Sequence, residues 1–169
     1  MLKNAHSYKD ILISLHRETW YDPRYTYYYC DVGCYDLSFE ENNYSKHQFA
    51  SVDKYGNVIG YISYGIDWAA LSADNFNIIN YDLGNVEFIK DCYRAVYDIF
   101  ETYKLNRIEW FCIADNPAIN GYRKFIKKYG GKECGYFRQF LKLLDGKIHD
   151  GVHFEILKEE FKAPEYFSR

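Results

Sequence analysis

The sequence predicts an α/β protein of the α+β type, in which helices flank both faces of a mixed, mostly antiparallel twisted sheet. Three strand-like runs joined by turns occupy residues 47–81, which is typical of an antiparallel meander. An amphipathic helix over residues 86–104 then leads into an apolar strand over residues 107–114. Because a helical crossover of this length usually joins parallel strands, the sheet is predicted to be mixed.

Length and composition bound the class of protein. The chain has 169 residues, which predicts a single domain over residues 1–169 with a sizeable core. Its formal net charge is −3 and, apart from residues 124–128, its basic residues are scattered, which argues against a nucleic-acid partner. The N-terminus turns polar too early for a signal peptide, and no apolar run is long enough to span a bilayer. We therefore expect a cytoplasmic protein without a membrane partner, either a monomer or a homodimer.

Cysteines and histidines do not predict a metal site. The five cysteines have no paired spacing and are expected to be free thiols. Cys30 and Cys34 have the spacing of two metal ligands, but no second pair accompanies them. His149 and His153 are four residues apart, which places them about 13 Å apart on a strand. We expect them to be solvent-facing residues of a hairpin turn.

The N-terminal third is predicted to hold one helix and an irregular segment. Apolar residues recur at helical spacing from residue 8 and predict a helix that ends near Trp20. Residues 21–46 show no clean period, so we expect a second short helix or a long loop, positioned as a substrate lid. The aromatic residues 25–29 are interpreted as half-buried scaffold, with a substrate mouth as the alternative.

The meander is predicted from alternating runs and their turns. Residues 47–53 and 58–66 form a hairpin around the turn Lys54–Asn57. A second turn, Ser72–Asn75, is expected to precede the third strand over residues 76–81.

The helix that begins near Val86 is the clearest element in the pattern. Asn85 is a good N-cap residue, and Glu87 suits the positive end of the helix dipole. After the 107–114 strand, Asn116–Pro117 predicts the start of another helix, which Gly130–Gly131 ends. Two long strands around a turn region are expected to follow.

Several motifs in the second half resemble the GNAT superfamily of acyl-CoA-dependent N-acetyltransferases. They are an asparagine-led helix, a Gly-Gly entry to the next strand, and a closing hairpin with two aspartates. In this chain they read Asn116-Pro117-Ala118-Ile119-Asn120-Gly121-Tyr122, then Tyr129-Gly130-Gly131 and Gly135, then Leu144-Asp145-Gly146, Asp150 and Phe154-Glu155-Ile156-Leu157. The order of elements resembles the family over residues 47–160, and the sharp motifs cover residues 116–157.

The resemblance implies transfer of an acetyl group from acetyl-CoA to a primary amine of a small molecule or a peptide N-terminus. Tyr122 matches the family's tyrosine acid, although it also belongs to the apolar face of its helix. The resemblance also implies that the 76–81 and 107–114 strands splay apart, with a polarising N–H near Asn80 or Tyr81. Asn116 and Asn120 are then expected to contact the pantetheine arm or the strand ends, and Asn116 is explained equally well as an N-cap.

The pyrophosphate loop departs from the family pattern Q/R-x-x-G-x-G/A. The corresponding residues are Asp82, Leu83, Gly84 and Asn85, with one glycine and no lysine or arginine. Together with Asn80 and Tyr81 they are predicted to bind coenzyme A through backbone N–H groups alone, and weakly.

Two alternatives remain open from the sequence. One is a catalytically inactive GNAT-fold binding or regulatory module, which the loop without basic residues favours. The other is an interaction protein that uses the aromatic segment 20–35. If the protein is a transferase, Asp67, Asp82 and Glu109 are the candidates for the general base, by their expected position near the cleft.

Overall fold

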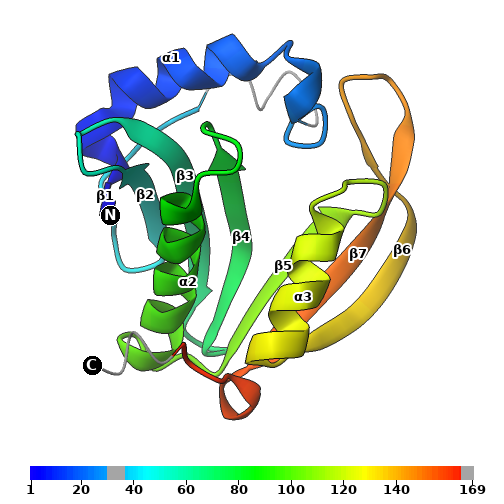
Figure 1. Ribbon diagram of the computed structural model, residues 1–169. Coiled ribbons are helices and arrows are strands. Elements are labelled where there is room, and N and C mark those ends of the chain that lie inside the picture. The colour runs from blue at the N-terminus through cyan, green and yellow to red at the C-terminus, as the bar shows by residue number, and fades with distance from the viewer. Residues whose placement is uncertain (30–36, 165–169) are drawn as a thin grey trace.

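The computed structural model describes residues 1–29 and 37–164 (Figure 1). Its seven-stranded sheet has the order β1-β2-β3-β4-β5-β7-β6. The strands are β1 (Leu2–Asn4), β2 (Lys46–Val52), β3 (Val58–Asp67), β4 (Ser72–Asn80), β5 (Arg107–Ile113), β6 (Lys132–Lys142) and β7 (Ile148–Leu157). The helices are α1 (Lys9–Thr19), α2 (Val86–Glu101) and α3 (Ile119–Tyr129), with 3₁₀ turns η1 (Ala5–Tyr8), η2 (Pro23–Tyr25) and η4 (Lys158–Glu160).

The pairing of the strands confirms a mixed, mostly antiparallel sheet. β4 and β5 are neighbours and run parallel, whereas each other neighbouring pair in the sheet is antiparallel. The crossover between β4 and β5 is α2, as the helical pattern predicted.

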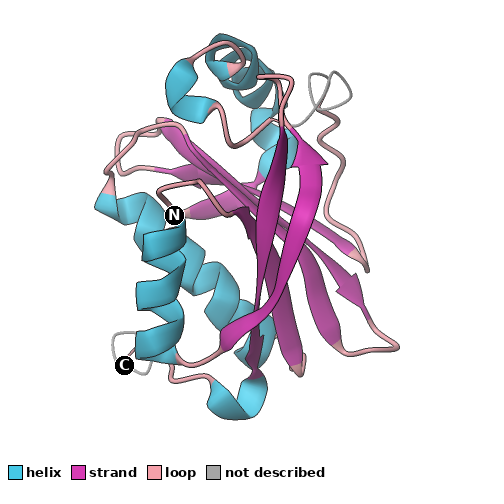
Figure 2. Cartoon of the chain, turned by 90° about the vertical axis from the view of Figure 1, so that its right-hand side faces the viewer, coloured by secondary structure: helices cyan, strands magenta, loops and turns pink. Residues whose placement is uncertain are grey.

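Helices cover both faces of the sheet, as expected. α2 and α3 lie side by side on one face (Figures 1 and 2). Ile62 of β3 packs there in one core cluster with Phe100 of α2. The adjacent Tyr61 points to the opposite face, where it joins a second cluster with Leu12 of α1. Each face of the β1–β4 half therefore has its own core.

The local chemistry of α2 matches its sequence. The Asn85 side chain accepts a hydrogen bond of 2.9 Å from the Glu87 N–H and so caps the helix. Its buried side chains share one face and include Phe88 and Ile99. The helix ends at Glu101, earlier than the expected residue 104.

The predicted turn Ser72–Asn75 is wrong. β4 already begins at Ser72, and the turn lies at residues 68–71. A bulge sets Asn75 and Phe76 opposite Tyr64 of β3, and Asn75 has a φ of 49°. Polar residues that are typical of turns are accommodated here because the strand is irregular at this position.

Further predictions need correction. α3 begins at Ile119 with Ala118 as its N-cap residue, and the Asn116 side chain accepts from the Ala118 N–H at 2.9 Å in the preceding turn. β1 was not predicted, since three residues show too little of a pattern. His149 and His153 lie in β7, and neither is exposed.

In the described part of the chain, no helix combines the length and apolar character needed to cross a membrane.

Candidate active site

Strands β4 and β5 separate soon after they pair. Their parallel register runs from Ser72 opposite Arg107 to Ala73 opposite Ile108. Beyond this point β4 continues along β3, and β5 continues along β7. The facing edges of β4 and β5 diverge (Figure 1), so backbone groups of β4 face an opening instead of a neighbouring strand. The structure thus places the expected splay between these strands.

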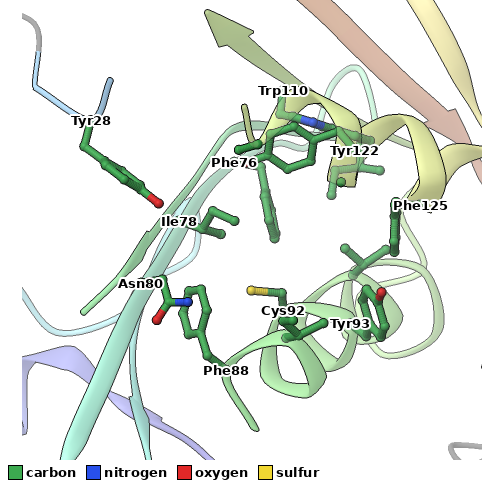
Figure 3. Close-up of a pocket in the computed structure, with 15 residues that line it drawn as sticks. Tyr28, Phe76, Ile78, Asn80, Phe88, Cys92, Tyr93, Trp110, Tyr122 and Phe125 are labelled. Carbon is green, nitrogen blue, oxygen red and sulfur yellow. The ribbon is translucent and has the colours of Figure 1, made fainter. Parts of the chain in front are cut away.

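A cavity of about 310 Å³ lies at the splay on the face covered by α2 and α3 (Figure 3). We call it the helix-side cavity. Its lining is dominated by aromatic and aliphatic side chains: Tyr28, Phe76, Ile78, Asn80, Phe88, Ile89, Cys92, Tyr93, Val96, Ile108, Trp110, Ala118, Gly121, Tyr122 and Phe125. Such walls suit an uncharged, flexible arm and do not suit a phosphate group.

A second cavity of about 310 Å³ opens on the other side of the splay. We call it the outer cavity. It is more polar, and its lining comprises Tyr27, Tyr28, Asp74, Asn75, Phe76, Asn77, Ile78, Glu109, Trp110, Phe111, Cys112, Ile113, Asn116, Tyr122, Leu141, Leu143 and His153. Tyr28, Phe76, Ile78, Trp110 and Tyr122 also line the helix-side cavity, so the two cavities meet at the splay.

Tyr122 lies where the two cavities meet. Its ring packs against Trp110 and Phe154, with centroids 5.9 and 5.8 Å away. Burial is the main cause that raises the pKa of Tyr122 well above its ordinary value, so the phenol stays protonated. Such a group can donate a hydrogen bond or a proton to a leaving atom at the splay. The ring also packs against the core, in agreement with the alternative interpretation.

The backbone groups of β4 at the splay alternate between its neighbour β3 and the opposite edge. The N–H of Tyr81 donates to the Ile59 carbonyl at 3.0 Å and is therefore engaged with β3. Antiparallel pairing alternates, so the backbone groups of Asn80 point to the opposite edge. Tyr28 lines both cavities, and burial raises the pKa of its hydroxyl to about 12. Of the two predicted N–H donors, Asn80 is the one directed toward the splay.

The loop between β4 and α2 satisfies most of its own hydrogen bonds. Its residues Asp82, Leu83 and Gly84 are exposed, and they are absent from the lining of both cavities. The Asp82 carboxylate accepts from the Asn85 side chain at 2.7 Å, and Gly84 has a φ of +91°. This loop forms the open strand–turn–helix junction that the sequence predicts, with a carboxylate at its centre.

Basic groups approach this junction from outside the loop. Lys90 of α2 forms an ion pair of 2.7 Å with Glu87, one turn into the helix. The hydrogen bond from Lys90 is the largest cause that lowers the pKa of Glu87, and Lys54 in the β2–β3 turn contributes to the same effect. The loop pattern in the sequence includes neither lysine, because Lys90 comes from α2 and Lys54 from the β2–β3 turn.

The two predicted asparagines differ in position. Asn116 lines the outer cavity, and its side chain shapes the turn before α3. Asn120 is exposed on α3 and lines neither cavity. The structure therefore brings Asn116, but not Asn120, to the splay.

The candidates for the general base also separate. Asp67 accepts the N–H groups of Ala69 and Ala70 in a turn, and it lines neither cavity. Glu109 lines the outer cavity and pairs with Arg107 at 3.1 Å. Asp82 lies in the loop between β4 and α2 and lines neither cavity. Of the three predicted candidates, Glu109 therefore lies at the outer cavity, and Asp67 and Asp82 do not.

The sequence analysis missed two titratable residues of the outer cavity. They are Asp74 and His153. The signal for His153 was the alternation of buried residues along 151–157, which indicates a strand and not a turn. No group of metal-ligating side chains occurs among the described residues, and Cys30 and Cys34 lie outside them.

Comparisons with known proteins place the fold. No family model matches the chain, and no curated protein matches it. Among solved structures, the spermidine N-acetyltransferase from Vibrio cholerae in complex with CoA and spermine is 20% identical, with a TM-score of 0.76, over 95% of this chain and 96% of that chain.

Other structures of this Vibrio cholerae enzyme match as well. A complex with manganese ions is 21% identical over 95% of this chain and 78% of that chain, with a TM-score of 0.61. A dodecameric structure in an intermediate state is 23% identical over 69% and 67% of the two chains, with a TM-score of 0.61. At these identities the likeness establishes the architecture, and the chain therefore has the GNAT fold that its motifs resemble.

Proposed function

We propose that this protein is an N-acetyltransferase that transfers the acetyl group of acetyl-CoA to a primary amine. The observation that carries the proposal is the position of Tyr122, a protonated phenol where two cavities meet between separated parallel strands. The helix-side cavity receives the pantetheine arm, and the outer cavity receives the acceptor. The known complex with CoA and spermine, which has the same fold, supports this assignment.

The outer cavity has the charge that an amine acceptor needs. Asp74 and Glu109 contribute carboxylates, and no lysine or arginine occurs among its described lining residues. Carboxylates attract and orient an ammonium group, and Phe111 and Tyr27 add aromatic faces that favour cations. A small molecule with a primary amine or a peptide N-terminus can therefore enter this side.

Each residue then has a defined role in the reaction. The Asn80 N–H polarises the thioester carbonyl. Tyr122 donates its proton to the departing thiolate. Of the predicted loop residues, Leu83 and Gly84 offer backbone N–H groups to the pyrophosphate, because those of Asp82 and Asn85 already donate within the protein. The lysines outside the loop supply positive charge.

The second candidate is an inactive binding module. It is favoured by the carboxylates of Asp82 and Glu87, which lie in the loop and in the first turn of α2, where an anionic cofactor would be repelled. Thermal unfolding with and without acetyl-CoA tests cofactor binding in both cases, because a ligand that binds the native state raises its melting temperature. A melting temperature that acetyl-CoA leaves unchanged would contradict the proposed transferase. A raised melting temperature without acetylated amine would support the module.

We also propose that the protein acts in the cytoplasm as a monomer or homodimer. The low net charge and the absence of a basic face in the sequence support a small-molecule or peptide partner.

A further inference from the structure

His153 lies in an aromatic enclosure at the outer cavity. It stands opposite Phe111 in the register of β7 and β5. The rings of Phe137, Phe140 and Phe111 surround its imidazole, with centroids 4.3, 5.2 and 5.8 Å away. His153 lines the same cavity as Tyr122, and it comes from a different strand. β7 thus places an ionisable ring, that of His153, at the outer cavity.

The two ring nitrogens of His153 have different surroundings. Nε2 is buried without a hydrogen-bond partner among the described residues. A proton on Nε2 can point at the surrounding aromatic faces, whereas a lone pair there would be repelled by them. This favours the tautomer with the proton on Nε2 and the lone pair on Nδ1, which is not among the buried atoms without a partner.

The charges around His153 leave it neutral at physiological pH. Burial lowers the pKa of His153, and Glu109 on the neighbouring β5 raises it by less. Asp74 of β4 lines the same cavity, and from β6 the imidazole meets the rings of Phe137 and Phe140. A neutral imidazole can accept a proton, as a general base requires.

The carboxylates of the cavity are already engaged. Glu109 is paired with Arg107, and its side chain is 42% exposed, so its negative charge is partly neutralised and well solvated. Asp74 accepts a hydrogen bond of 3.2 Å from the Asn75 side chain. Nε2 of His153 has no hydrogen-bond partner among the described residues. The imidazole is therefore the base that remains available.

We propose that His153 is a catalytic residue that accepts the proton released by the acceptor amine. This inference rests on the proposed function and assigns the general base of that same site. It replaces the three carboxylates expected from the sequence.

The step balances in atoms and electrons. The lone pair of the uncharged amine forms a C–N bond with the thioester carbonyl carbon, and the carbonyl π electrons move to oxygen. Nδ1 of His153 takes one proton from the nitrogen of this adduct. The oxygen electrons then re-form the carbonyl as the C–S bond breaks, and the thiolate takes the Tyr122 proton. The imidazolium returns its proton to water, and the Tyr122 phenolate regains one.

The test compares His153→Gln with a matched control, His149→Gln. His149 lies on the same strand, lines neither cavity and pairs with Asp115 and Asp145. Acetyl transfer from acetyl-CoA is measured from pH 5 to 9 with an alkylamine, a diamine, spermidine and a peptide with a free N-terminus. We expect His153→Gln to lower kcat/KM by about 10²–10⁴-fold and to remove the acidic limb of the profile, with the affinity for acetyl-CoA unchanged. The control should retain both the rate and the limb.

The outcomes separate this inference from the proposed function. Transfer by the parent protein, with His153→Gln within about three-fold of the parent across the pH range, would overturn the role of His153 alone. An inactive parent with every amine would overturn the proposed function and the role of His153 with it. If His153→Gln does not fold, NMR titration of the parent decides. The pKa of His153 must then coincide with the acidic limb of kcat/KM, and a mismatch would overturn the assignment.

Discussion

Glu87 and Lys90 form a 2.7 Å ion pair across the first turn of α2, at the helix end that follows the 80–85 loop. A helix N-terminus attracts anions, and Glu87 already occupies that position with its own charge. Lys90 is the cation that a pyrophosphate would need there, and the ion pair holds it. The charge at this junction therefore depends on Glu87 and Lys90 of α2 as well as on the loop, which has no basic residue.

Replacing Glu87 with Gln should tighten coenzyme A binding by about two- to five-fold, because it removes a competing anion and frees Lys90. The measurement is titration calorimetry at low salt. Glu101→Gln is a matched control, since Glu101 pairs with Lys104 at 3.2 Å across the same spacing at the other end of α2. Equal affinities for Glu87→Gln and the parent would show that the pyrophosphate lies elsewhere.

Leu83→Arg should tighten coenzyme A binding further by adding a cation to the loop. Leu83 is 48% exposed and lines neither cavity, so the substitution leaves the core intact. Asn85→Arg is a poorer test, because Asn85 caps α2 and its loss typically costs about 1 kcal/mol of stability. The salt dependence of binding should steepen in Leu83→Arg, and an unchanged dependence would contradict the placement of the phosphates.

Tyr28→Phe should tighten acetyl-CoA binding by a few-fold. Tyr28 lines both cavities where they meet, so its hydroxyl has to lose its hydration when the thioester enters, and phenylalanine removes that cost. The phenyl ring keeps the packing against Tyr25, whose centroid lies 5.5 Å away. Weaker or equal binding by Tyr28→Phe, with an unchanged melting temperature, would show that the thioester does not bind beside Tyr28.

The pH dependence of stability should contain a contribution from His47. This residue is 7% exposed, its Nδ1 meets the Tyr103 hydroxyl at 3.3 Å, and burial lowers its pKa. Below the unfolded pKa of about 6.5, the unfolded chain takes up a proton that folded His47 resists. The stability that neutral His47 provides is present above that pH and is lost as the pH falls toward the folded pKa.

His47→Phe should therefore lose less stability than the parent between pH 7.5 and pH 5. Urea unfolding at the two pH values gives the difference, and the aromatic contacts with Tyr64 and Phe49 are kept by the new ring. Parallel losses in both proteins would contradict the lowered pKa of His47.

The order of elements followed from local patterns because period and capping are local properties. The strands that flank α2 were predicted as neighbours from the crossover, and the Asn85 cap came from residue type alone. The start of β4 was missed because a bulge lets Asn75 occupy a strand with a positive φ. Turn-forming residues and bulge residues are the same types, so sequence does not separate them.

The site was less predictable, since it depends on contacts between distant segments. Tyr122 belongs to a local motif, and the structure places it where the two cavities meet. His153 was predicted to face solvent in a turn. Its position opposite Phe111 depends on the pairing of β7 with β5, which a local pattern does not show. Lys90 lies outside the loop motif. The first turn of α2 brings it next to Glu87, and this contact depends on the helix and not on the loop sequence.

The central claim is acetyl transfer at the splay with Tyr122 as the proton donor. The most direct test is single-turnover acetylation of a primary amine by saturating parent protein and by Tyr122→Phe. Tyr129→Phe serves as a control on the same helix, because Tyr129 itself lines neither cavity. We predict acetylated amine with the parent and the control, and a rate about 10²–10⁴-fold lower with Tyr122→Phe at equal acetyl-CoA affinity. A parent that forms no acetylated amine, or a Tyr122→Phe variant as fast as the parent, would contradict it.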